Sequence, residues 1–136
     1  MRSAPGTHRA ATTDFFRVFV VPGMKHCSAG DGAFAVDYLS YLEAWVEQHR
    51  APDVMIGAHV DTNYLLHSED AGASDGERIW WAAFRLMYPL DPEIPVTFTR
   101  ALYPYPAYAR YKGTGDPNDA RNFGPVTPPA RAGDGH

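Results

Sequence analysis

His26 and Cys27 are neighbours just beyond a hydrophobic run, residues 15–21, which ends at Pro22-Gly23. A run that is apolar at nearly every position predicts a strand buried on both faces, as in a parallel sheet. His26 is then expected on the loop past the end of that strand, where α/β enzymes place catalytic groups. Because histidine titrates near neutral pH, His26 is a candidate general base. Cys27 is the only cysteine, so a disulfide would need a partner outside this chain.

A second motif, Gly72-Ala73-Ser74-Asp75-Gly76, matches the G-x-S-x-G pattern of a nucleophile elbow. The elbow requires a buried strand directly before the serine, and His67-Ser68-Glu69-Asp70 is polar. In α/β-hydrolases the serine also precedes the histidine in the chain, whereas Ser74 follows His26. The pattern therefore predicts a glycine-rich surface loop and no nucleophile at Ser74.

Metal binding has weaker support. His59 and Asp61 are alternate residues at a predicted strand end and share a face, but no third ligand stands at a recognisable spacing. Asp116, Asn118 and Asp119 resemble a calcium loop superficially, without its glycine and closing glutamate. Asx turns explain these three residues better, and we expect no metal site.

The elements that must position these groups follow from periodicity and turn residues. The periodicity of residues 33–49 predicts an amphipathic helix, which Pro52 stops. Its apolar face, expected to point toward the core, carries Tyr38, Leu42, Trp45 and Val46. Residues 54–60 predict a short strand and residues 96–102 an extended segment, while residues 61–95 are ambiguous. The expected division is a polar lead-in, one module and a flexible tail: 1–13, 14–124 and 125–136.

Composition excludes several classes. The 136 residues suffice for one domain with a modest core, and the 45% hydrophobic content excludes global disorder. A net charge of −4 gives no reason to expect nucleic acid as a partner. No apolar run reaches the length of about 18 residues that a transmembrane helix needs. The first 13 residues are polar, so we expect no signal peptide there.

Two blocks carry a family resemblance. Residues 15–27 resemble the segment that holds the triad histidine in the tannase and feruloyl esterase family of serine esterases. Residues 98–106, 109–120 and 122–123 resemble the C-terminal signature of that family, in matching order. The resemblance implies a C-terminal fragment of an α/β-hydrolase fold, namely a terminal strand, the histidine loop, an amphipathic helix and an irregular Pro/Gly-rich tail.

The resemblance also implies an activity, the hydrolysis of phenolic acid esters through a Ser-Asp-His triad. It makes His26 the triad base and pairs Cys27 with a cysteine before the nucleophilic serine. The serine, the acid and the lid domain, with its calcium site, belong to upstream segments, so the chain alone is expected to be inactive and without a cofactor. The expected partner is a small phenolic ester, with no nucleic acid and no membrane. Family members are often secreted or periplasmic.

Tyr103 and Gly124 stand where some family members have cysteines, so a C-terminal disulfide is not expected. Four tyrosines nearby predict a half-buried cover over the sheet, with a ligand-stacking patch as the alternative: Tyr103, Tyr105, Tyr108 and Tyr111. The rival to the esterase hypothesis is a small non-catalytic binding or interaction module derived from the same fold. A metal hydrolase using His59 and Asp61 is a remote third option. A Gly-Cys-Ser elbow encoded upstream would favour the esterase.

Overall fold

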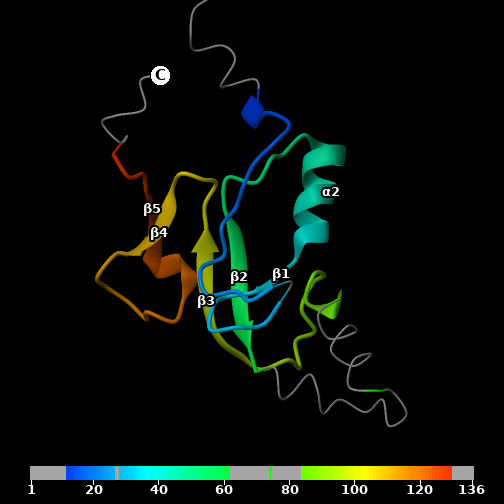
Figure 1. Cartoon of the computed structure of the whole chain (residues 1–136), viewed down its shortest axis with the longest axis vertical. Helices are drawn as coiled ribbons and strands as arrows, with labels where there is room; N and C mark the ends of the chain where they lie inside the picture. The colour runs from blue at the N-terminus through cyan, green and yellow to red at the C-terminus, as the bar shows by residue number, and fades with distance from the viewer. Residues whose placement is uncertain (1–11, 27, 62–73, 75–83, 130–136) are drawn as a thin grey trace, which may run out of the picture.

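The computed structural model describes residues 12–26, 28–61, 74 and 84–129. These residues form a small mixed α/β structure with one helix of several turns and two short antiparallel sheets. In Figure 1 the helix α2 and the two-stranded sheet β4–β5 lie on opposite sides of the β2–β3 pair. Among the described residues, no helix has both the length and the apolar character needed to cross a membrane.

The larger sheet has the order β1 (Ala35–Val36), β2 (Met55–Val60), β3 (Val96–Leu102). All of its pairings are antiparallel, with Ala35 opposite Ala58 and Met55 opposite Leu102. A register shift between His59 and Val60 bends β2 near its end. The predictions of strands over residues 54–60 and 96–102 are therefore confirmed, but the described sheet contains no parallel pair.

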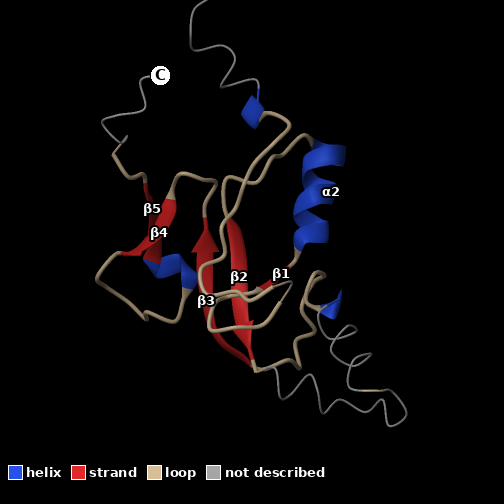
Figure 2. Cartoon of the chain, viewed as in Figure 1, coloured by secondary structure: helices blue, strands red, loops and turns tan. Residues whose placement is uncertain are grey.

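The predicted buried strand over residues 15–21 is wrong for this structure, which draws the segment as a loop (Figure 2). The segment contacts the chain after β3 through a bridge from Phe19 to Pro104. Beside that bridge, the Tyr105 N–H donates a 2.7 Å hydrogen bond to the Val18 carbonyl. Phe19 packs against the core, whereas Phe15 and Val20 are 74% and 57% exposed. Only one side of this segment packs on the core, so the apolar side chains that point the other way meet no packing layer among the described residues.

The buried residues in the described part of the chain form two core clusters. The first cluster joins β1 and β2 to the segment that contains Leu86 and Ile94. Its members are Phe34, Ala35, Ala58, Val60, Leu86 and Ile94. The second joins β1, the start of β2 and the end of β3 through Val36, Met55 and Leu102. Val36 and Val60 are the large side chains with almost no exposure, so packing is tightest around these two valines.

Helix α2 (Tyr38–Gln48) is shorter than the predicted span of residues 33–49. Residues 35–36 pair with β2 instead, and Asp37 caps the helix by accepting a 3.0 Å hydrogen bond from the Ser40 N–H. The helix ends at His49, which adopts a left-handed conformation.

The face of α2 that meets the sheet differs from the prediction. Tyr38 and Tyr41 pack against the second cluster, and the Tyr41 hydroxyl accepts a 3.0 Å hydrogen bond from the Ile56 N–H. Leu42 and Val46 are 56% and 66% exposed, so their predicted inward orientation is wrong. Trp45 is half-buried. The half-buried residues Tyr38, Tyr41 and Trp45 follow spacings of three and four, and the apolar surface of the helix is wider than this contact.

Arg17 ties the N-terminal segment to the far end of α2. Its Nη1 donates to the Pro52 carbonyl at 2.6 Å and to Asp53 Oδ1 at 2.7 Å. Its guanidinium also lies 5.7 Å from the centre of the Trp45 ring. The segment before His26 is therefore anchored at Arg17 and again at Phe19.

The second sheet pairs β4 (Tyr108–Tyr111) with β5 (Phe123–Val126). The Asx turn predicted at Asp116 and Asn118 is confirmed within the turn over residues 113–119: the Asn118 N–H donates to Asp116 Oδ1 at 2.8 Å. Asp119 caps the short helix η1 (Ala120–Asn122). Because β5 continues to Val126, regular structure extends past Pro125, where the sequence predicts a tail.

Candidate active-site loop

His26 lies on an exposed loop, as predicted, although the strand expected before the loop is absent. The two arms of the loop meet at a bridge between Met24 and Gly30. The Lys25 N–H donates to the Ala29 carbonyl at 2.9 Å, and the Ser28 N–H donates to the His26 carbonyl at 2.9 Å. The backbone therefore holds His26 at the tip of a closed loop with its side chain at the surface.

The other elements of the predicted triad chemistry cannot be placed. Cys27 lies outside the described residues, so its disulfide stays a prediction. Of the Gly72–Gly76 pattern the structure describes only Ser74, which is exposed. The expectation that this pattern is a surface loop and not a nucleophile elbow therefore also stays a prediction.

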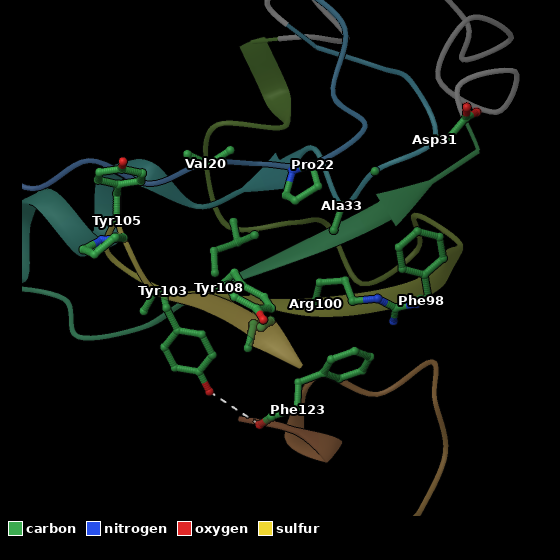
Figure 3. A pocket seen from close by; sticks show the side chains of 16 residues that line it. Val20, Pro22, Asp31, Ala33, Phe98, Arg100, Tyr103, Tyr105, Tyr108 and Phe123 are labelled. Carbon is green, nitrogen blue, oxygen red and sulfur yellow. Dashed lines mark hydrogen bonds between the residues drawn. The ribbon is translucent and has the colours of Figure 1, made fainter. Parts of the chain in front are cut away.

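A hollow of about 540 Å³ opens between the base of the His26 loop and the C-terminal part of the chain (Figure 3). Pro22, Asp31 and Gly32 contribute the loop side. The opposite side comes from β3, the chain that follows it, β4 and β5. Its larger side chains are Phe98, Arg100, Leu102, Tyr103, Tyr105, Tyr108 and Phe123. Its size and largely apolar lining are those of a small-molecule site or of a surface that receives another part of a protein.

Arg100 is a charged residue of this hollow that the sequence alone does not single out. Its guanidinium carbon lies 4.4 Å from the centre of the Phe98 ring and 4.7 Å from that of Phe123. Its Nη1 donates to the carbonyls of Thr99 and Pro117, at 2.7 and 2.8 Å. Figure 3 shows the side chain between the two rings. Phe98 and Arg100 are alternate residues of β3, a spacing that places both on one face and could have indicated the stack.

The four tyrosines do not form the half-buried cover that the sequence predicts. Tyr103 is half-buried, and its hydroxyl donates a long, 3.4 Å hydrogen bond to the Phe123 carbonyl (Figure 3). Tyr105 and Tyr108 line the hollow but are 71% and 49% exposed, and Tyr111 is also exposed. The reason is that they follow β3 and occupy the small second sheet, which no further layer of the described residues covers.

His59 is accounted for by contacts within the fold. Its Nδ1 is hydrogen-bonded to Thr97 Oγ1 at 2.6 Å, and the same hydroxyl lies 3.2 Å from the His59 carbonyl oxygen. The ring stacks on Phe98 at 4.8 Å and meets the edge of Phe34 at 5.5 Å. No group of three or more His, Cys, Asp or Glu side chains in the described part of the chain could hold a metal ion.

In the described part of the chain, three groups have shifted pKa values, and none of them belongs to the His26 loop. Hydrogen bonds from Arg121 lower the pKa of Asp119, and the same pairing raises the pKa of Arg121. Burial against the sheet raises the pKa of the Tyr38 hydroxyl. These shifts report the Asp119–Arg121 pairing at the start of η1 and the partial burial of Tyr38.

Comparison with known proteins gives consistent results. Residues 4–126 match the family described as tannase and feruloyl esterase. The chain is 36% identical over 124 residues to a mono(2-hydroxyethyl) terephthalate hydrolase of Piscinibacter sakaiensis, and the match covers 91% of this chain and 16% of that protein. It is 32% identical over 112 residues to a probable feruloyl esterase of Arthroderma benhamiae, covering 81% of this chain and 15% of that protein.

The fold comparison points the same way. A crystal structure of an esterase from Aspergillus oryzae superposes with a TM-score of 0.54 at 24% identity, over 86% of this chain and 20% of the esterase. At that identity the likeness concerns the fold alone. The chain thus spans about a sixth of the two named relatives and a fifth of the solved esterase.

Proposed function

Because the chain belongs to the tannase and feruloyl esterase family, we propose that it forms the histidine-bearing, C-terminal part of an α/β-hydrolase that cleaves esters of phenolic acids. The observation that carries the proposal is the match over residues 4–126, which includes both the His26 loop and the C-terminal strands. The names of the relatives, a terephthalate ester hydrolase and a feruloyl esterase, support an aromatic ester as the substrate class.

In the proposed mechanism His26 is the general base. It takes the proton of a nucleophilic serine as the serine attacks the ester carbonyl, and it then gives that proton to the leaving alcohol. In the second half-reaction His26 activates a water molecule that hydrolyses the acyl-enzyme. An acid residue orients the imidazole. Serine and acid belong to the portion of the enzyme outside the segment that this chain matches.

Cys27 has a supporting role in this proposal. A disulfide from Cys27 to a cysteine beside the nucleophilic serine would hold the base close to the nucleophile. Such a tether lowers the entropy cost of bringing the two groups into the reactive geometry. The proposed ester chemistry uses side chains alone and requires no cofactor.

A chimera tests the proposal. The aligned segment of the Piscinibacter hydrolase is replaced by residues 4–126, and hydrolysis of mono(2-hydroxyethyl) terephthalate is measured with and without His26→Ala. We expect His26→Ala to lower kcat at least about 10³-fold, since a triad loses most of its rate enhancement without its base. His49→Asn is the matched control: it removes another exposed histidine, and asparagine tolerates the left-handed backbone at that site. Equal activity of the His26→Ala chimera would contradict the proposal.

The isolated chain provides a second test. It should not hydrolyse methyl ferulate or a gallate ester above background, because the proposal places the nucleophilic serine outside this chain. Turnover that disappears in Ser74→Ala would show that the Gly72–Gly76 pattern is a nucleophile elbow after all, and that the chain is a self-sufficient esterase.

The hollow beneath the His26 loop supports a second function, that of a non-catalytic binding module. Its volume of about 540 Å³ and its aromatic lining suit a phenolic ring. If the chain is a module of this kind, the isolated chain should bind methyl ferulate, and binding should shift the NMR signals of Arg100 and Tyr108. Unshifted signals at millimolar ligand would leave the esterase fragment as the better account.

A further inference from the structure

Glycines flank His26 on both arms of its loop. Gly23 precedes it with φ +77°, and Gly30 follows it with φ +101°, values that residues with a side chain rarely adopt. Gly32 lies at the base of the second arm and donates its N–H to the Gly23 carbonyl at 3.2 Å. The two arms therefore run backbone against backbone.

The space between the arms admits no side chain. A Cβ on Gly32 would lie 2.0 Å from the Pro22 carbonyl oxygen, and a Cβ on Gly30 would lie 2.3 Å from the Gly23 carbonyl oxygen. Both obstacles are backbone atoms, which cannot rotate away as a side chain does. A methyl group at either position must therefore push the arms apart and break the closed loop.

This closure matters because the segment before the loop is not a regular strand. The anchors of residues 15–21 at Arg17 and Phe19 lie several residues before His26, and no regular strand pairing in the described structure continues from them to the loop. The hydrogen bonds within the loop supply that rigidity. A general base needs such rigidity, since a displacement of about 1 Å can lower a rate roughly 10²-fold.

We propose that Gly30 and Gly32 are positioning residues for His26: their missing side chains let the loop close on its own backbone and fix the base. The inference rests on the proposed role of His26 as the base. Its geometric content, a rigid His26 backbone that depends on two glycines, can be measured without any enzymatic activity.

The experiment uses the full chain labelled with ¹⁵N. In the wild type we expect the amide order parameter of His26 to equal those of β2 and β3, about 0.85. Gly32→Ala and Gly30→Ala should lower it below about 0.6 and shift the imidazole ¹⁵N signals of His26, while the amide signals of β2 and β3 stay in place. A flexible His26 amide in the wild type would overturn the proposal without any variant.

Gly113→Ala is the matched control. Gly113 also has a positive φ, +84°, but nothing lies within 4 Å of the position that an added methyl group would take, so the substitution strains the backbone far from His26 without a clash. We expect it to lower the melting temperature and leave the order parameter at His26 unchanged. If Gly30→Ala and Gly32→Ala also left that order parameter unchanged, the glycines would have no positioning role. A chimera that works without His26 would instead refute the proposed function and would not alter these NMR values.

Discussion

Two valine-to-alanine substitutions test where the core of this fold lies. Val60 on β2 is fully buried in the first cluster, whereas Val46 on α2 is 66% exposed. The side chain loses the same two carbons in both cases, so the difference in stability reports mainly burial, apart from the helix propensity that alanine gains at position 46. The pair also separates the structure from the sequence pattern, which places Val46 on the inward face of the helix.

The expected magnitudes follow from burial. Val60→Ala loses the transfer free energy of two carbons, about 1.6 kcal/mol at roughly 0.8 kcal/mol each. An incompletely closed cavity adds about 1 kcal/mol, so the free energy of unfolding should fall by about 2–3 kcal/mol. Val46→Ala gives up little burial and gains about 0.5 kcal/mol of helix propensity, for a net change near zero.

Urea unfolding followed by circular dichroism measures both values. At slopes of about 1–3 kcal/mol per molar urea, Val60→Ala should move the midpoint by about 1–2 M with the slope unchanged, and Val46→Ala should hardly move it. Leu42→Ala, at another exposed position of the helix, should cost far less than a buried leucine would. The reasoning fails if Val46→Ala is as destabilising as Val60→Ala, because α2 would then bury the face that the structure exposes.

Three further predictions concern charged and titrating groups. Arg17→Ala should lower the free energy of unfolding by about 1–2 kcal/mol, but Asp53→Asn by under about 0.5 kcal/mol, since Asp53 is 92% exposed; urea unfolding compares them. The carboxyl of Asp119 should titrate below 3.8 by NMR, and Arg121→Ala should raise its pKa only part of the way back, because the hydrogen bond from the backbone N–H of residue 121 remains. Stability from that pair is present above pH 3.8 and lost as pH falls through the lowered pKa. The Tyr38 hydroxyl should titrate above 10.0 by ultraviolet absorbance. Because burial disfavours the ionised form, stability falls as pH rises above 10.0, a loss absent in Tyr38→Phe.

Local chemistry explains what the sequence predicts correctly. Residues 96–102 and 54–60 form strands because their β-branched and aromatic side chains suit a pleated, half-buried surface. The turn over residues 113–119 forms because two glycines accept positive φ values and Asp116 accepts a hydrogen bond from the Asn118 N–H. The loop position of His26 follows equally from Pro22-Gly23. Each of these outcomes depends on neighbours in the sequence.

The predictions from sequence are wrong where the structure of a segment depends on contacts with residues distant in the sequence. Residues 35–36 carry helical periodicity but pair with β2, so α2 begins at Tyr38. Val46 lies on the apolar stripe of the helix, yet the contact that forms uses Tyr38 and Tyr41. The Arg100 stack depends on Phe123, which is far from β3 in the sequence and adjacent to it only through the second sheet. Periodicity defines an apolar face and leaves open what covers it.

The segment over residues 15–21 shows this most clearly, and it links the fold to the proposed function. An apolar residue at nearly every position is typical of a strand covered on both faces. The described residues cover one face, through Phe19, and leave Phe15 and Val20 exposed. A chain that spans about a sixth of its relatives contains few elements that could cover the other face. In the proposed enzyme the same segment would be an interior strand, and the part that covers it would bring the serine and the acid to His26.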